Sequence, residues 1–436
     1  MATAIPDPGP SRRVFAGLGL AAVLAVTGTA CAPEKTSTDT TAPEQRPAPE
    51  NSSIPAKTKT ASGISLSLPA PSGKYPIGTV DLHLVDRSRR DPLKPSKPHR
   101  ELMISLWYPA ERAENRPVAP WMSAGAAADW DQHSAPGLGI PAGAVDWAAT
   151  STHARVNAPV NRDAGNLPVL LFSSGDGGVR TLGTTLVEEL ASRGYLVLTV
   201  DHTYEADQVE FPGGRVERAV PLPAKLTESV IAKLLRKHSK ARVADVTFVL
   251  DRLADLDYGR SPDADGKSLP AGLRGAVNRS RIGLLGQSLG GSVAAQVAHD
   301  DARVDAAVNL DSEFVGRVAR TGVATPFLLV GSALHTRDNQ PSWKSFWTNS
   351  TGWKRQLSFA GAAHASFTDL QVVFPQLIGR VKDLPVTDLI GTIDPQQSVS
   401  AQRGYVSAFF DLHLLGRPTG LFTGPSDQYP DVKLVP

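Results

Sequence analysis

The sequence has 436 residues, of which 41% are hydrophobic, so the chain can bury one large core or two modest ones. Its 45 Lys and Arg residues nearly balance its 43 Asp and Glu residues, and the basic side chains are scattered along the chain. This composition excludes a fibrous or wholly disordered protein, and the absence of a basic stripe argues against a nucleic-acid partner.

The first 31 residues are typical of an export signal. Arg12 and Arg13 precede an uncharged apolar run, 14–30, that is shorter than a typical membrane span. The arginine pair resembles a twin-arginine signal, which implies export in the folded state. Cys31, the single cysteine, follows the run at a position that resembles the lipidated cysteine of bacterial lipoproteins. We therefore expect an extracytoplasmic protein, held at a membrane surface by lipid on Cys31 or, alternatively, secreted freely.

Residues 32–65 are rich in Pro, Ser and Thr and contain almost no large apolar side chains, which predicts a disordered tether. The remaining residues, 66–436, are predicted to form one folded domain. There, apolar β-rich runs alternate with helical patterns, which predicts an α/β fold with a mainly parallel central sheet flanked by helices. Predicted helices cover 183–195 and 240–256, and another lies near the C-terminus. Strands are predicted at 101–110, 167–174, 196–201, 281–286, 304–311, 326–331 and 355–360.

Two stretches, 111–165 and 204–239, do not fit this alternation, and we interpret them as cap-like insertions over one end of the sheet. Ligands of such folds bind at the carboxyl ends of the strands. We therefore expect the insertions to shape a substrate pocket, with Trp121, Met122 and Trp130 narrowing it so that small groups are preferred.

Ser288 lies between Gly286 and Gly290 in the motif GLLGQSLGG, directly after the predicted strand 281–286 and before an alanine-rich helical stretch. A Gly-x-Ser-x-Gly motif between a strand and a helix is typical of a nucleophile elbow. The turn is so tight that side chains at the two glycine positions would collide with the neighbouring strand and helix. We therefore interpret Ser288 as a catalytic nucleophile; the alternative is a glycine-rich turn with an idle serine.

A serine nucleophile needs a histidine base held by a carboxylate, and both are expected after the serine in this type of fold. The histidines that follow Ser288 are His299, His335, His364 and His413. His299 falls in the helix after the elbow and His413 in the C-terminal helix, so we interpret both as structural. His364 lies in a loop of small residues directly after the strand 355–360, where the base belongs.

Two carboxylates are candidates for holding His364. Asp311 ends the strand 304–311, whereas Asp338 lies in the loop after the next strand, the position that most hydrolases of this type use. Position favours Asp311, because the end of a rigid buried strand orients an imidazole better than a loop does. Asp311 could instead be a helix N-cap.

Five segments together resemble the bacterial relatives of the plasma-type (isoform II) platelet-activating factor acetylhydrolases: LLFSSGDGGVRT, LASRGYLVLTVDH, GLLGQSLGG, AAVNLDSEF and HASFTDL. The resemblance runs from about residue 75 to 430. It implies an α/β-hydrolase fold and calcium-independent cleavage of short or oxidised acyl esters, phospholipids included. It also implies that Ser288 is the nucleophile, Asp311 the acid and His364 the base, with the backbone N–H groups of Leu289 and Asp176 as oxyanion donors.

The sequence departs from this family at the elbow, where Gln287 replaces the usual histidine, and in the oxyanion loop, which reads SSGD. Backbone donors tolerate any side chain. A carboxylate at Asp176 is nevertheless unfavourable near a developing oxyanion unless it points to solvent or pairs with Arg180.

Three alternatives remain open. A dinucleotide-binding unit is suggested by LLFSSGDGG and the later Asp201, but Arg180 stands where a third small residue is needed. A lipoprotein that binds a hydrophobic ligand without catalysis is the second alternative. The third is a cutinase-like, polyester-degrading or general carboxylesterase with the same chemistry.

We expect no cofactor and no metal, because no cluster of histidines or carboxylates has ligand spacing. The expected partners are a small ester or phospholipid substrate and a membrane surface reached through the lipid anchor. We expect a monomer.

Overall fold

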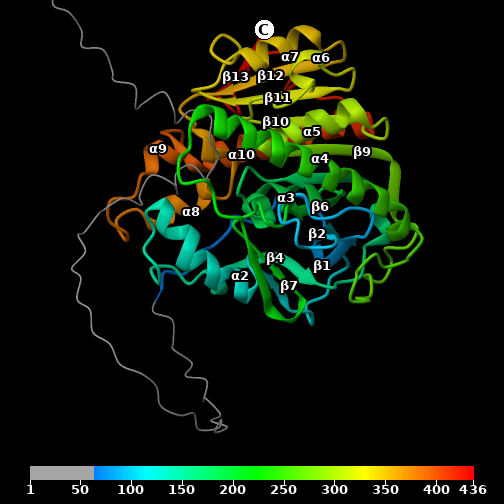
Figure 1. Cartoon of the computed structure of the whole chain (residues 1–436). Helices are drawn as coiled ribbons and strands as arrows, with labels where there is room; N and C mark the ends of the chain where they lie inside the picture. The colour runs from blue at the N-terminus through cyan, green and yellow to red at the C-terminus, as the bar shows by residue number, and fades with distance from the viewer. Residues whose placement is uncertain (1–62) are drawn as a thin grey trace, which may run out of the picture.

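The computed structural model describes residues 63–436 (Figure 1). The predicted export signal, Cys31 and nearly all of the predicted tether lie outside these residues. Within residues 63–436, no helix is long and apolar enough to cross a membrane.

One large sheet forms the centre of the domain (Figure 1). Its strands are β1 (Ile77–Asp86), β2 (Arg100–Pro109), β3 (Val118–Pro120), β4 (Ser151–Val156), β5 (Leu167–Ser173), β6 (Leu196–Asp201), β9 (Val277–Gln287), β10 (Ala306–Leu310), β11 (Phe327–Ser332), β12 (Lys354–Phe359) and β13 (Val432–Val435). Their order in the sheet is β13-β12-β11-β10-β9-β5-β6-β2-β1-β4-β3. A separate hairpin pairs β7 (Gln208–Phe211) with β8 (Arg215–Arg218).

The middle of the sheet is parallel, as predicted. Strands β6, β5, β9, β10, β11 and β12 pair in parallel, whereas β2 is antiparallel to both β6 and β1, and β13 is antiparallel to β12. Because the carboxyl ends of parallel strands meet at one edge, the loops after β5, β9, β10, β11 and β12 lie together there.

Helices cover both faces of the sheet (Figure 1). The α-helices of residues 63–436, not all of which lie on the sheet, are α2 (Ala124–Asp129), α3 (Thr184–Ser192), α4 (Glu228–Asp257), α5 (Leu289–Asp300), α6 (Val318–Thr321), α7 (Pro341–Asn349), α8 (Leu370–Leu377), α9 (Val386–Ile390) and α10 (Pro395–Leu415). Alternate strand residues serve the two faces: Leu171 packs with α4 and α5, whereas Leu170 and Phe172 pack with α3 and α10. Successive residues of a strand point to opposite faces of the sheet. When helices cover both faces, every residue of the strand is buried, so the strand has a continuous apolar sequence.

Helix α4 is longer than predicted. It begins at Glu228, with the Thr227 side chain accepting the Val230 N–H, and not at residue 240. The first turns of α4 do carry apolar residues at helical spacing, among them Val230, Ile231 and Leu234, and these side chains are only partly buried.

The stretch 111–165 does two things in the fold. Its strand β4 pairs in parallel with β1 and so extends the sheet. Its tryptophans Trp121, Trp130 and Trp147 are at most 2% exposed and pack ring against ring, in a cluster shared with Phe374 of α8. These side chains, together with Met122, are core residues that join this stretch to α8.

Candidate active site

Ser288 occupies the single-residue turn between β9, which ends at Gln287, and α5, which begins at Leu289. Its φ is 51°, a left-handed conformation that is strained for a residue with a side chain. The Ser288 N–H donates to Leu310 O over 2.9 Å, which holds the serine beside the end of β10. This is the geometry of a nucleophile elbow.

The two glycines of the motif allow this turn. A Cβ atom at Gly286 would lie 2.2 Å from the carbonyl carbon of Gly290, and one at Gly290 would lie 2.0 Å from Ser173 O. No side chain fits at such distances. The collisions predicted from the sequence are therefore present in the structure.

Asp311 directly follows β10 and also has a left-handed backbone, with a φ of 60°. Its Oδ2 atom lies 2.8 Å from Nδ1 of His364. Its Oδ1 atom accepts the Ser332 N–H over 2.7 Å and lies 2.9 Å from Nδ1 of His335. Burial acts to raise the pKa of Asp311, but the hydrogen bonds from His335 and His364 hold it well below its ordinary value. The carboxylate therefore stays ionised and can orient an imidazole.

His364 follows β12 at the start of the short helix η9 (His364–Phe367), with 29% of its side chain exposed. Because the ionised Asp311 has no proton to give, Nδ1 of His364 carries a hydrogen and Nε2 of the neutral ring is an acceptor. The amide nitrogen of Gln287 lies 3.2 Å from this Nε2 atom. Gln287 thus contacts the atom that would accept the proton of a nucleophile.

His335 is a site residue that the sequence analysis did not select. It follows β11 as Asp311 follows β10 and His364 follows β12, so three adjacent parallel strands each deliver one member of the cluster. Its position directly after a buried parallel strand could have identified His335 as a site residue from the sequence. Asp338, the alternative acid, lies exposed in the turn beyond β11.

The histidines interpreted as structural lie away from this cluster. His299, near the end of α5, lies 2.7 Å from Asp300 Oδ1 through its Nδ1. The His413 ring on α10 packs against Trp353, with ring centroids 4.4 Å apart.

The loop after β5, residues 174–178, lies against the elbow. A Cβ atom at Gly175 would be 2.5 Å from Gln287 Oε1 and 3.0 Å from Ser288 Cβ. Within residues 63–436, neither the Asp176 N–H nor the Leu289 N–H has a hydrogen-bond partner. Both groups are thus available as donors near Ser288.

The carboxylate of Asp176 has a partner that the sequence did not suggest. It neither points to solvent nor pairs with Arg180; its Oδ1 atom lies 2.7 Å from Nδ1 of His238 on α4, and both residues are buried. Burial acts to raise the pKa of Asp176, but the hydrogen bond and charge of His238 lower it. Arg180 pairs instead with Asp201, so the acidic residue of the dinucleotide-binding alternative is used in an interior ion pair.

Two groups of side chains in the described part of the chain bring three potential metal ligands together. They are Asp311 with His335 and His364, and Asp176 with Glu205 and His238; in each, the ligand atoms lie within 4.8 Å of one another. In both groups the carboxylates already accept hydrogen bonds, Glu205 from Arg242 over 2.6 Å.

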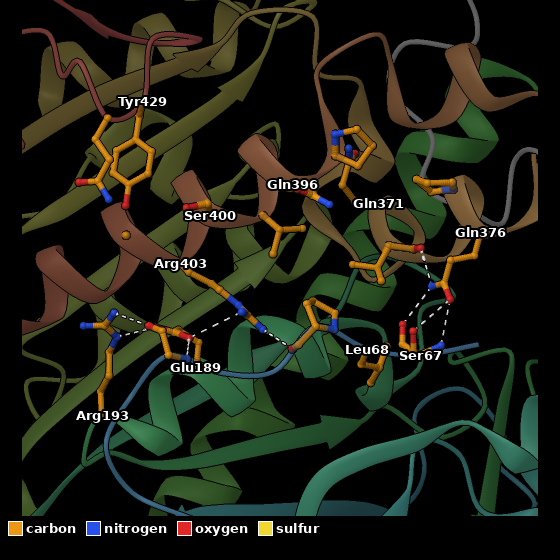
Figure 2. A pocket seen from close by; sticks show the side chains of 18 residues that line it. Ser67, Leu68, Glu189, Arg193, Gln371, Gln376, Gln396, Ser400, Arg403 and Tyr429 are labelled. Atoms are coloured by element: carbon orange, nitrogen blue, oxygen red, sulfur yellow. Dashed lines mark hydrogen bonds and ion pairs between the residues drawn. The ribbon is translucent and has the colours of Figure 1, made fainter. Parts of the chain in front are cut away.

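Hollows of very different size lie near the elbow and beside α10. A small cavity of about 10 Å³ is lined by loop and elbow residues, among them Gly175, Asp176 and Gln287. A separate groove of about 610 Å³ is bounded by residues 67–72 and by α3, α8 and α10, and none of its lining residues belongs to the Ser288 cluster. Figure 2 shows Arg193 and Arg403 on either side of Glu189 in one wall of that groove.

Comparison with known proteins agrees with this geometry. Residues 60–416 match the family of platelet-activating factor acetylhydrolase, isoform II. A probable 1-alkyl-2-acetylglycerophosphocholine esterase of Arthroderma benhamiae is 30% identical over 403 residues, which cover 84% of this chain and 93% of that protein. The platelet-activating factor acetylhydrolase of Gallus gallus is 26% identical over 271 residues, 57% of this chain and 62% of that protein.

Among solved structures, a ferulic acid esterase from Streptomyces cinnamoneus has the same fold. It is 35% identical, with a TM-score of 0.71, and the match covers 85% of this chain and 99% of that one. The α/β-hydrolase fold predicted from the sequence is therefore confirmed. Since the family match spans most of the chain, this chain belongs to the platelet-activating factor acetylhydrolase, isoform II family and is a carboxylic ester hydrolase.

Proposed function

We propose that the chain hydrolyses short-chain acyl esters through an acyl-enzyme on Ser288, with His364 as base and Asp311 as acid. One observation carries the assignment: the 2.8 Å contact between Asp311 and His364, made from the ends of β10 and β12 beside the strained Ser288 turn. A buried ionised carboxylate, an imidazole in one tautomer and a serine in an elbow are the parts that nucleophilic acyl transfer needs.

Each residue has one role in the proposed reaction. Nε2 of His364 takes the proton of Ser288 as the serine oxygen attacks the ester carbonyl, and Asp311 stabilises the imidazolium that forms. Nε2 of His364 has a single lone pair and can accept only one hydrogen bond. The Gln287 amide must therefore leave this atom when the Ser288 hydroxyl donates its hydrogen bond there. The imidazolium then protonates the leaving alcohol, and a water molecule activated by His364 hydrolyses the acyl-enzyme. The Leu289 and Asp176 N–H groups are the proposed donors to the oxyanion in both halves.

A short or oxidised acyl group on a phospholipid-like alcohol is the proposed substrate. The names of the Arthroderma benhamiae and Gallus gallus relatives support an acetyl ester. A second candidate is an aromatic acyl ester, favoured by the ferulic acid esterase. Initial rates on p-nitrophenyl acetate, butyrate and hexadecanoate, on methyl ferulate and on an acetylated glycerophosphocholine separate these classes. Faster turnover of the hexadecanoate than of the acetate would contradict the short-acyl proposal.

The triad is tested by Ser288→Ala. We expect esterase activity near background with an unchanged melting temperature, because neither β9 nor α5 depends on the hydroxyl group. A fluorophosphonate probe should label the native protein and not this variant. A native protein that stays unlabelled would indicate a ligand-binding protein without catalysis.

We further propose that the protein is exported and anchored through lipid on Cys31. The motif around that residue supports this proposal. In Cys31→Ser, the protein should leave the membrane fraction and keep its specific activity. Unchanged membrane association would contradict a lipid anchor at this residue.

A further inference from the structure

Arg242, on α4, is bound to the oxyanion loop through the backbone of that loop. The guanidinium is fully buried. It donates to Ser174 O through Nη1 and to Gly175 O through Nη2, the latter over 2.7 Å. It also donates to both carboxylate oxygens of Glu205, with 2.6 Å between Nη2 and Oε1. A planar guanidinium with five donors can hold two carbonyls and a carboxylate at once.

These bonds determine where the loop points its N–H groups. In a trans peptide the C=O and the N–H point in opposite directions. Gly175 O points at Arg242, so the N–H of the same peptide group, which belongs to Asp176, points away from Arg242. The loop approaches Ser288 so closely at Gly175 that a Cβ there would lie 3.0 Å from Ser288 Cβ. The Asp176 N–H is therefore turned from the buried arginine toward the nucleophile side of the loop.

Neighbouring contacts hold both the arginine and the loop. Glu205 is 3% exposed, and its Oε1 atom also accepts the Gly177 N–H over 3.1 Å. His238 lies four residues before Arg242 on α4, on the same face of the helix, and bonds the Asp176 side chain. Arg242 and His238, on one face of α4, thus bind three consecutive loop residues, Ser174 to Asp176.

We infer that Arg242 is a positioning residue that fixes the Asp176 N–H as an oxyanion donor. This inference rests on the proposed function. Arg242 acts on the reaction only through the loop backbone, because its donors are already bonded to the loop, to Glu205 and to the Ser173 hydroxyl at the end of β5. Its removal should therefore lower the rate of the chemical step and leave substrate binding nearly intact.

The experiment compares Arg242→Lys with the native protein on p-nitrophenyl acetate and on the matching thionoacetate. A lysine keeps the charge but cannot bond both carbonyls and Glu205 in a planar fork. We expect kcat on the acetate to fall by about 10²-fold, the order expected for loss of one oxyanion donor, with KM changed less than about threefold. Sulfur is a poorer hydrogen-bond acceptor than oxygen, so the ratio of kcat on the acetate to kcat on the thionoacetate should fall by roughly tenfold.

Arg100→Lys is the matched control. Arg100 is also fully buried and bonds two carboxylates, those of Asp245 and Asp91, but it does not contact residues 174–178. This variant should lose stability and keep the native ratio of acetate to thionoacetate turnover. A fall in that ratio equal to the fall in Arg242→Lys would overturn the inference, because it would show a general effect of buried arginines.

A second variant covers the possibility that Arg242→Lys does not fold. The pair Arg242→Gln with Glu205→Gln removes both buried charges together, so no uncompensated charge remains. It should show the same fall in kcat and in the ratio. Native kcat and ratio in either folded variant would overturn the inference while leaving the triad intact. Retained activity in Ser288→Ala would instead contradict the proposed function itself.

Discussion

Two aspartate–histidine pairs lie on opposite sides of Ser288, and their contacts are nearly the same. Asp311 meets His364 over 2.8 Å, and Asp176 meets His238 over 2.7 Å. They differ in the exposure of the histidine side chain, which is 29% for His364 and 6% for His238. Only the exposed imidazole can exchange a proton with a substrate. The same contact therefore orients the proposed base on one side of Ser288 and holds the loop 174–178 on the other.

This comparison shows that a carboxylate beside an imidazole does not by itself identify a catalytic pair. Each pair fixes a ring and a backbone segment relative to each other. What assigns a chemical role is the group that the second ring nitrogen faces. For His364 that nitrogen contacts Gln287, the residue directly before Ser288, the proposed nucleophile.

The largest expected effect on kcat comes from removing the contact between Asp311 and His364. Asp311→Asn should reduce kcat by about 10⁴-fold with little change in melting temperature, because the amide no longer holds the imidazole in the required tautomer. Steady-state kinetics on p-nitrophenyl acetate measure this loss. Asp338→Asn is the control and should change kcat less than about tenfold. The reverse pattern would move the acid to the loop after β11.

Removing the contact between Asp176 and His238 should lower kcat less than removing the contact between Asp311 and His364. Asp176→Asn and His238→Gln should each lower kcat by about tenfold, because the Asp176 N–H remains and Arg242 still holds Gly175 O. The double variant should be no slower than either single variant, since both remove the same contact. Additive losses would show that the two side chains act separately.

Replacement of His335, which also contacts Asp311, should lower kcat by a smaller factor. His335→Phe keeps a ring of similar size but removes one hydrogen bond from Asp311 Oδ1, which still accepts the Ser332 N–H. We expect kcat to fall by about threefold to tenfold, the cost of one hydrogen bond to a charged group being near 1 kcal/mol or more. A fall as large as that of Asp311→Asn would place His335 in direct contact with the reaction.

The smallest expected effect is on the stability of the protein and concerns Asp207, whose carboxyl group lies near Asp176. Burial raises the pKa of Asp207 from 3.8 to about 7, opposed by a hydrogen bond from Ser134 and increased by the charge of Asp176. The folded protein therefore holds this proton more tightly than the unfolded chain does, and stability should fall as the pH rises from 3.8 to about 7.

In Asp207→Asn that fall should be smaller. The variant should melt roughly 2 to 4 °C above the native protein at pH 8 and near the native temperature at pH 4, as measured by calorimetry. A difference that is the same at both pH values would show that the carboxyl does not titrate in this range.

Much of the fold and most of the candidate site could be predicted from local pattern. The strand, the serine between two glycines and the following helix are contiguous in the sequence, so the elbow follows from steric arguments at Gly286 and Gly290. Asp311 and His364 could be selected because each ends or follows a buried strand, and parallel strands bring their carboxyl ends to one edge. The sheet strands β1, β3, β4 and β13 and the first turns of α4 were missed. The start of α4 was missed although Val230, Ile231 and Leu234 recur at helical spacing, because the Pro and Gly residues before it led us to interpret 204–239 as an insertion.

The sequence by itself therefore determined the order of elements, the elbow and the side of the sheet on which the site lies. The tertiary structure alone decided which partner each polar side chain found. Asp176 binds His238, 62 residues away, and Gly175 O binds Arg242, 67 residues away. Trp121, Trp130 and Trp147 pack in a core cluster with residues of α8. Hydrophobic periodicity records which face of a helix is buried, but not which buried polar group it meets, because that depends on how distant segments pack.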